Sequence, residues 1–172
     1  ALALFTGFSL YRDLRPASFA GTAYEPPTEA PHFSLVEHTG RTLRLSDLRG
    51  QPVLLFFGYT RCPDVCPLTL SALRQSLDRI GAGPAEARVL MVTVDPANDT
   101  METLARYVAN FGPGVSGLTG SPDALKALYG AYGVHATPTG GAHPEMMHTP
   151  VVFGIDRQGQ LRVLLHPTDS AS

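Results

Sequence analysis

The chain has 172 residues, a formal net charge of -2, 44% hydrophobic residues and 16% charged residues. This length suits one domain with a full hydrophobic core, and the composition is that of a globular protein. The balanced charge, without any run of Lys or Arg, excludes the basic surface that nucleic-acid binding needs. The chain has only 2 cysteines, too few for a disulfide scaffold of the small secreted kind, so their close spacing points to local chemistry.

The first residues differ from the rest of the chain. Residues 1–11 are apolar up to Arg12 but too few to span a bilayer, which takes about 20 residues. We interpret them as the remnant of a membrane anchor or signal sequence, the alternative being an amphipathic helix packed on the domain. Residues 12–30 contain several prolines and no apolar periodicity, which predicts a linker. The domain is then predicted to cover residues 31–172.

The first half of the predicted domain contains a hairpin, two buried strands and a helix. Apolar side chains alternate on both sides of a turn at residues 39–40, which predicts a β-hairpin over residues 33–45. The continuous apolar runs at residues 53–57 and 89–94 predict strands that are covered on both faces. Between them, the apolar spacing of residues 64–80 is helical and is followed by glycines, which predicts a helix that ends there.

The second half is predicted to contain two helices and a closing hairpin. Residues 100–111 show helical spacing and are followed by Gly-Pro, and residues 122–132 predict a shorter helix. Val134 begins an extended stretch that is interrupted at residues 137–144, whose composition is typical of a flexible surface insertion. Residues 149–165 predict a hairpin with its turn at Arg-Gln-Gly.

This order of elements predicts an α/β domain. It implies a mixed central sheet with right-handed parallel crossovers, helices on both faces and an N-terminal β-hairpin. In such sheets, reactive groups gather beyond the carboxyl ends of the central strands. Cys62 follows the buried strand at residues 53–57, so it is predicted to lie at this edge.

The two cysteines frame the start of a predicted helix, with Cys62 just before it and Cys66 in its first turn. The helical rise brings their Cα atoms to about 6 Å, within the range for a disulfide. The N–H groups and dipole at a helix start favour thiolates, which bind metals and exchange disulfides. Asp64 opposes this effect unless its carboxylate caps the helix. Two inert, buried cysteines are the alternative.

A third metal ligand is expected from elsewhere, because two thiolates leave a transition-metal site incomplete. His148 is favoured among the histidines, since it immediately precedes the closing hairpin. Met146 and Met147 beside it are soft donors that suit Cu(I), although such side chains also fill apolar gaps. His135 and His143 flank the glycine-rich insertion and are candidates for a transient second site.

Asp95 ends the second buried strand, at the same sheet edge as the cysteines. One interpretation is a cap for the turn before the next helix. The other is a carboxylate that orients the ligand histidine or takes up a proton released when a thiol binds metal.

These residues resemble the signature of the Sco (SenC) family of copper proteins. The resemblance is carried first by residues 50–67, GQPVLLFFGYTRCPDVCP. It continues in Val94-Asp95-Pro96 with Asp99-Thr100 and in His148-Thr149, and it covers about residues 31–167. The three residues between the cysteines distinguish the chain from ordinary thioredoxins, which have two.

The resemblance implies a membrane-tethered, thioredoxin-like domain on the periplasmic or other extracytoplasmic side. It implies copper, as Cu(I), Cu(II) or both, bound by Cys62, Cys66 and His148, and Asp95 matches a further position of the family pattern. It also implies a role in assembling the binuclear copper centre of cytochrome c oxidase, by copper delivery or by reduction of that centre's cysteines. The implied partners are the copper-receiving oxidase subunit, other copper carriers and thiol reductants. The glycine- and proline-rich insertion before His148 departs from the family's usual loop.

Other functions remain open at this point. A thiol-disulfide oxidoreductase acting on protein partners is the main alternative, with Cys62 and Cys66 as the redox groups. A peroxidase of the peroxiredoxin class needs a threonine and an arginine beside its cysteine, and Thr60 and Arg61 precede Cys62. A zinc site is chemically accessible to cysteines and histidines, but only 2 cysteines are present.

Overall fold

The computed structural model describes residues 21–138, 146–148 and 151–166. Eight strands form a central sheet, and β7 (Ala136–Pro138) and β8 (Met146–His148) form a separate ribbon. The helices are α2 (Val65–Arg79), α3 (Met101–Val108) and α4 (Pro122–Ala131), with short 3-10 helices at Leu45–Leu48 and Ala109–Phe111. The strands of the central sheet are β1 (Thr22–Glu29), β2 (Ser34–Glu37), β3 (Thr42–Arg44), β4 (Val53–Gly58), β5 (Arg88–Thr93), β6 (Val115–Thr119), β9 (Val152–Ile155) and β10 (Gln160–Leu165).

The central sheet is mixed, with the strand order β1-β10-β9-β4-β5-β6-β2-β3. β4, β5 and β6 are parallel, and each joins its neighbour through a helix. β9 pairs with β4 in the antiparallel direction, and β2 does the same with β6. β4 therefore lies in the middle of the sheet, and the loop that follows it opens at the carboxyl edge.

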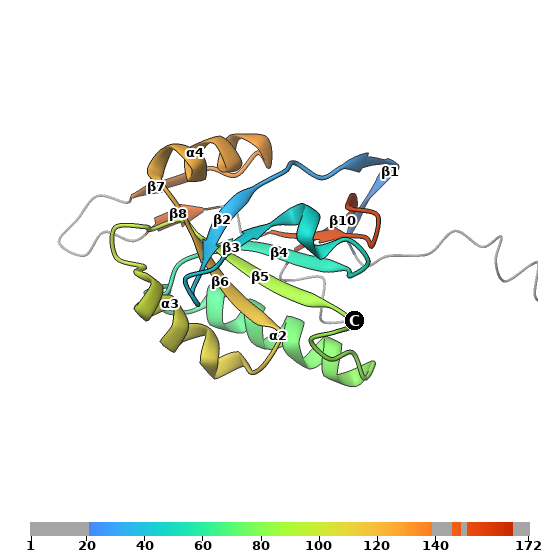
Figure 1. Ribbon diagram of the computed structural model, residues 1–172, viewed down its shortest axis with the longest axis horizontal. Helices are drawn as coiled ribbons and strands as arrows, with labels where there is room; N and C mark the ends of the chain where they lie inside the picture. Colours follow the sequence, from blue (N-terminus) through green and yellow to red (C-terminus); the bar gives the residue numbers. More distant parts are fainter. Residues whose placement is uncertain (1–20, 139–145, 149–150, 167–172) are drawn as a thin grey trace, which may run out of the picture.

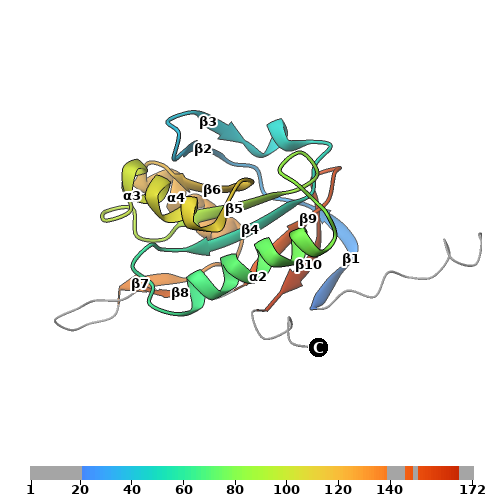
Figure 2. The ribbon, with the colours of Figure 1, turned by 90° about the horizontal axis from the view of Figure 1, so that it is seen from below.

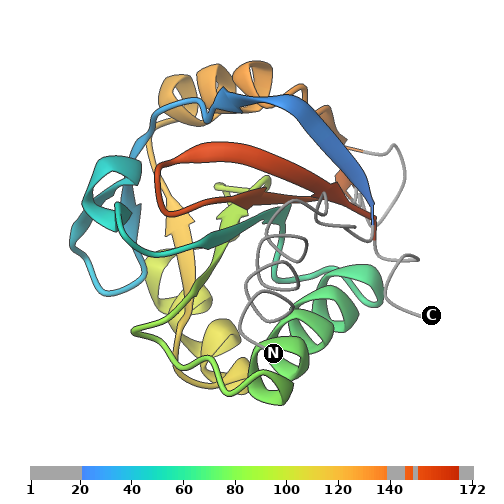
Figure 3. The same cartoon turned by 90° about the vertical axis from the view of Figure 1, so that its right-hand side faces the viewer.

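Helices cover both faces of this sheet. Figure 1 shows α4 on one face and α2 and α3 on the other, and the view in Figure 3 shows the same separation. The predicted α/β class, mixed sheet and helices on both faces are confirmed. The predicted N-terminal hairpin is also confirmed, as the antiparallel pair of β2 and β3.

The local sequence explains where α3 and α4 begin. The hydroxyl of Thr100 accepts a hydrogen bond from the N–H of Thr103 at 3.2 Å, and that of Ser121 accepts one from Ala124 at 3.2 Å. Such caps satisfy N–H groups that have no partner within the helix. Pro122 follows in the first turn of α4, where its missing N–H costs nothing.

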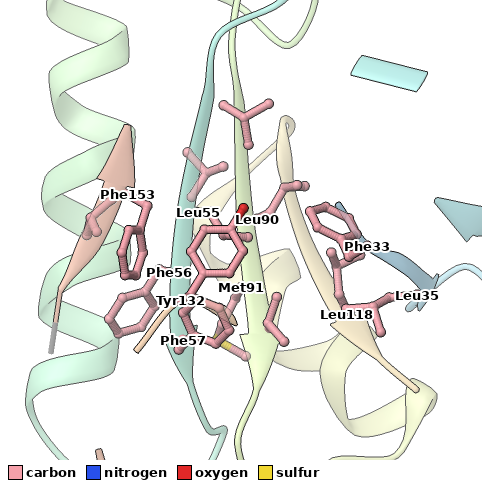
Figure 4. Close-up of a cluster of buried hydrophobic side chains, with 14 of the residues drawn as sticks. Phe33, Leu35, Leu55, Phe56, Phe57, Leu90, Met91, Leu118, Tyr132 and Phe153 are labelled. Atoms are coloured by element: carbon pink, nitrogen blue, oxygen red, sulfur yellow. The ribbon is translucent and has the colours of Figure 1, made fainter. Parts of the chain in front are cut away.

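The core lies between the sheet and its helices. Aromatic rings pack against one another at β4: the rings of Phe57 and Tyr132 are tilted, with centroids 5.5 Å apart, and those of Tyr132 and Phe153 pack edge to face at 4.9 Å (Figure 4). Such pairs add about 0.5–1.5 kcal/mol each to the burial of their apolar area. This packing fixes β4, the strand that leads into the cysteine loop.

The predicted linker at residues 12–30 is wrong for residues 22–29. These residues form β1, which pairs antiparallel with β10 from Thr22 opposite Leu164 to Glu29 opposite Gln160. Prolines are tolerated at a sheet edge, where the strand needs hydrogen bonds on one side only. The ladder is irregular between Ala23 and Thr28, the stretch that contains the prolines. The ordered domain therefore begins before residue 31.

β6 was not predicted from the sequence. Its short sequence, VSGLT, lacks the continuous apolar run of the other parallel strands. Gly117 is required by packing, because a Cβ there would stand 3.0 Å from the Cβ of Leu104 on α3. The glycine that weakens the strand pattern is thus what allows α3 to pack closely on the sheet.

The extended stretch predicted from Val134 includes the start of β7, whose last two residues overlap the predicted insertion at residues 137–144, and β8 was not predicted. β7 and β8 pair antiparallel, with Ala136 opposite His148. Figures 1 and 2 both show this ribbon at the same end of the molecule as the start of α2. Residues 139–145 lie outside the described part of the chain, as do residues 1–11 with their predicted anchor. Within the described part, no helix is long and apolar enough to cross a membrane.

Candidate metal centre

The two cysteines form a buried pair at the carboxyl edge of the sheet. Cys62 lies in the loop between β4 and α2, and Cys66 lies in the first turn of α2. Their exposed fractions are 8% and 0%, and neither forms a disulfide. The backbone N–H of Cys66 donates a hydrogen bond to Sγ of Cys62 at 3.4 Å. The helix start therefore directs an N–H at one of the sulfurs, as the spacing of the cysteines predicts.

Burial decides the protonation of Cys66. Burial raises the pKa of the Cys66 thiol far above its ordinary value, a backbone hydrogen bond at Tyr59 opposes this rise, and Cys62 and Asp99 add to it. The sequence predicted that the helix start would favour the thiolate, but desolvation outweighs that effect at Cys66. A metal ion that binds this sulfur must therefore displace its proton.

Asp64 occupies the N-cap position of α2, but its side chain makes no capping hydrogen bond. It is exposed to solvent. The predicted capping role is therefore not observed, and solvent screens its charge instead.

The loop before Cys62 is fastened to the end of β5 through Asp99. Asp99 is completely buried (0% exposed), and its carboxylate accepts hydrogen bonds from the Thr60 N–H at 3.2 Å and the Thr60 hydroxyl at 2.6 Å. The Thr93 hydroxyl also donates to it, at 2.6 Å. Burial raises the pKa of Asp99, and the hydrogen bonds from Thr60 and Thr93 oppose this rise.

Asp95 holds the next residue of the same loop. Its carboxylate lies 2.9 Å from Nη2 of Arg61 and also accepts a hydrogen bond from Asn98 at 2.9 Å. The side chain of Asp95 is 8% exposed and that of Arg61 is 54% exposed. Asp95 therefore positions the cysteine loop through Arg61. Its predicted action on a ligand histidine remains a prediction.

The structure places the backbone of His148 at the end of β8, at the end of the molecule where α2 begins (Figure 2). Met146 and Met147 belong to the same strand. His135 is exposed just before β7, and His143 lies outside the described residues. The described residues contain no group of three or more His, Cys, Asp or Glu side chains arranged to hold a metal ion. The third ligand is therefore still a prediction.

The role of Asp99 was not predicted from the sequence, and Tyr107 was predicted only as an apolar residue of the helix at residues 100–111. The hydroxyl of Tyr107 is buried and makes no hydrogen bond within the described part of the chain. Burial raises the pKa of Tyr107, and Cys66, Cys62 and Asp99 raise it further. The available signal for Asp99 was its position one turn after Asp95, beyond the same strand end.

The mixed sheet, with a reduced cysteine pair at the helix that follows a central strand, defines a thioredoxin-like domain with a dithiol centre. Residues 21–172 match the sequence profile of the SCO1/SenC family. The chain belongs to this family.

Curated relatives include mitochondrial and bacterial proteins. The bovine mitochondrial protein SCO2 homolog is 45% identical over 105 residues, which are 60% of this chain and 40% of that protein. The human mitochondrial protein SCO1 homolog is 35% identical over 133 residues, 74% of this chain and 44% of that protein. A putative copper-binding protein of Stutzerimonas stutzeri is 35% identical over 139 residues, 77% of this chain and 66% of that protein. The chain thus matches less than half of the length of the bovine and human relatives.

Solved structures share the fold over most of the chain. Apo Sco1 of Thermus thermophilus has a TM-score of 0.79 and 35% identity, covering 89% of this chain and 90% of that chain. Copper-bound ScoI of Arabidopsis thaliana has a TM-score of 0.75 and 28% identity, covering 81% and 88%. Copper-bound ScoI of Bradyrhizobium japonicum has a TM-score of 0.73 and 31% identity, covering 84% and 96%.

Proposed function

We propose that this chain binds copper through Cys62, Cys66 and His148 and helps to mature the binuclear copper centre of cytochrome c oxidase. The observation that carries the proposal is the buried, reduced pair of cysteines at the start of α2, in a chain of the SCO1/SenC family. Two relatives with the same fold are described as copper-bound, and a third is named a putative copper-binding protein.

The donor atoms suit copper. Thiolates are soft ligands that select Cu(I), and imidazole binds copper as well. Cys66 contributes a sulfur with 0% exposure, so the metal it holds is shielded from water on that side. Because loading releases thiol protons, copper affinity is expected to rise with pH.

Copper titration of the reduced protein tests the proposal. Under anaerobic conditions, with a Cu(I) chelator as competitor, the wild-type protein is expected to bind one copper ion. Cys62→Ser and Cys66→Ser are expected to abolish competitive binding. His148→Ala is expected to weaken it at least about tenfold, which corresponds to about 1.4 kcal/mol. His32→Ala is the matched control, because the side chain of His32 is 64% exposed and has no proposed role in metal binding.

Each variant tests a different part of the proposal. Unchanged affinity in both cysteine variants would refute copper binding at this pair. Equal affinities for His148→Ala and His32→Ala would leave the dithiol as the site and exclude His148 as its third ligand.

Thiol-disulfide exchange is the second candidate function, and the close approach of Cys66 N–H to the Cys62 sulfur favours it. In this reaction the two thiols form a disulfide, and their two electrons and two protons reduce a disulfide of the partner protein. Equilibration with glutathione measures the potential of the pair. A value below about -300 mV is typical of structural disulfides and would argue against this function.

The partner under this proposal is the copper-receiving subunit of the oxidase, and the domain works on the extracytoplasmic side of a membrane, to which it is tethered. Curated relatives named mitochondrial support such a setting. Mixing the copper-loaded domain with the metal-free copper domain of that subunit tests the transfer. The appearance of the visible absorption of the binuclear centre is expected, and copper that stays on the donor would contradict direct delivery.

A further inference from the structure

Asp99 makes a contact that the proposed copper chemistry does not itself explain. It is a carboxylate with 0% exposure, located between the end of β5 and the start of α3. Its donors are neutral: the amide and hydroxyl of Thr60 at 3.2 and 2.6 Å, and the hydroxyl of Thr93 at 2.6 Å. A buried carboxylate is unfavourable unless such donors compensate the water it has lost.

These contacts act on the cysteine loop at a defined point. Thr60 stands two residues before Cys62, and both of its polar donors bind the same carboxylate. A pair of hydrogen bonds from one residue fixes its direction as well as its distance. The Thr93 hydroxyl in turn accepts a hydrogen bond from the Asp95 N–H at 2.9 Å. The loop is thus tied to the end of β5, a central strand of the sheet.

The neighbouring residue is tied to the same strand end by a separate contact. Arg61 binds Asp95 at 2.9 Å, but its side chain is 54% exposed. Exposed ion pairs contribute little to stability. The contact of Thr60 with Asp99, a residue with 0% exposure, is therefore the stronger restraint on the loop.

We propose that Asp99 is a positioning residue for the dithiol, which holds the loop through Thr60 so that the Cys62 sulfur stays in register with Cys66. This inference rests on the proposed function, because copper affinity is the main quantity that tests it. Ligand side chains that hydrogen bonds already hold in position bind metal more tightly, because they lose less conformational entropy when the metal binds.

The test compares variants that remove different hydrogen-bonding atoms of the Thr60–Asp99 contact. Asp99→Ala removes every acceptor, Asp99→Asn retains one acceptor oxygen, and Thr60→Val removes only the hydroxyl. Asp99→Ala and Thr60→Val are expected to weaken Cu(I) binding about 10- to 100-fold, the usual effect of losing a partner that orients a ligand. Asp99→Asn is expected to recover most of the affinity lost in Asp99→Ala.

A matched control separates positioning from general stability. Ser116→Ala removes another buried hydroxyl, which donates to Glu37 at 2.6 Å and accepts from Arg88 at 2.7 Å. Arg88 begins β5 whereas Thr93 ends it, so this cluster lies at the far end of the strand. Ser116→Ala is expected to lower the urea midpoint without changing copper affinity.

The outcomes are distinct. Wild-type copper affinity in folded Asp99→Ala and Thr60→Val would overturn the inference, as would an equal loss of affinity in Ser116→Ala. If Asp99→Ala fails to fold, Thr60→Val decides, because it leaves the carboxylate in place. If the wild-type protein binds no copper, the proposed function fails. The potential of the Cys62–Cys66 disulfide then tests the inference by itself, with a shift expected in Thr60→Val and none in Ser116→Ala.

Discussion

Gly58 and Cys66 lie directly against each other: a Cβ built on Gly58 would stand 3.1 Å from Sγ of Cys66. The same Cβ would approach a ring carbon of Phe56 at 2.6 Å. The end of β4 therefore leaves room for the sulfur only because position 58 has no side chain.

Gly58→Ala is expected to lower the free energy of unfolding by about 1–3 kcal/mol, because overpacking forces the Phe56 ring and the cysteine apart. Urea unfolding measures this loss, and copper titration is expected to show weaker binding as well. Gly130→Ala in α4 is the control, since a Cβ there meets nothing within 4 Å. It is expected to stabilise the helix by about 0.5–1 kcal/mol. Equal stability of the two variants would contradict the close approach at Gly58.

Tyr107→Phe is expected to stabilise the protein. The Tyr107 hydroxyl is buried without a hydrogen-bond partner in the described part of the chain, and such a group costs about 1–3 kcal/mol. Tyr129→Phe is the matched variant and is expected to destabilise the protein, because the Tyr129 hydroxyl donates a hydrogen bond to the Thr93 carbonyl at 2.6 Å. Thermal unfolding of both variants checks the prediction, and a lower melting temperature for Tyr107→Phe would show that its hydroxyl is satisfied.

Glu37 is expected to make stability depend on pH. Burial by itself would raise the pKa of Glu37, but hydrogen bonds from Ser116 and Thr39 and the charge of Arg88 hold it below its ordinary value of 4.5. A carboxylate with a lowered folded pKa stabilises the protein above its unfolded pKa, and this contribution is lost as pH falls through the folded pKa.

The Glu37→Gln variant isolates this contribution. At pH 7 it is expected to cost about 1–3 kcal/mol, because Arg88, whose side chain is only 23% exposed, loses its charged partner. The difference from the wild-type protein is expected to shrink as the pH is lowered below 4.5. Urea unfolding across this range provides the measurement, and a difference that does not change with pH would contradict the assignment.

A chain that starts at Ala30 tests the correction at the N-terminus. It lacks β1 and exposes the edge of β10, whose unpaired N–H and C=O groups can pair with another molecule. A lower melting temperature than that of a chain starting at Gly21, together with self-association on size-exclusion chromatography, is expected. If both chains melt and elute alike, residues 22–29 behave as the linker that their prolines predict.

The sequence was sufficient where the fold depends on local pattern. The apolar runs at residues 53–57 and 89–94 and the helical spacing at 64–80 correspond to β4, β5 and α2. The cysteine spacing was also sufficient to predict a pair at the helix start. In these segments, the signal and the structure lie within the same few residues.

The sequence was insufficient where a partner lies far along the chain. β1 is ordered by pairing with β10, near the other end of the domain. β6 needs a glycine because α3 packs on it. Thr60 and Asp99 are 39 residues apart, and neither carries a local pattern that indicates their contact. Such features become visible only once the sheet order is known.

β5 has a polar cluster at each of its two ends, and the two clusters have different roles. Arg88 at its start binds Glu37 and Ser116, and Thr93 at its end binds Asp99. The five residue steps between them span about 17 Å of strand, and the intervening side chains are apolar and completely buried. Substitutions this far apart are expected to act additively. Substitutions at the Arg88 end of this strand can therefore raise thermal stability without changing the properties of the dithiol at the Thr93 end.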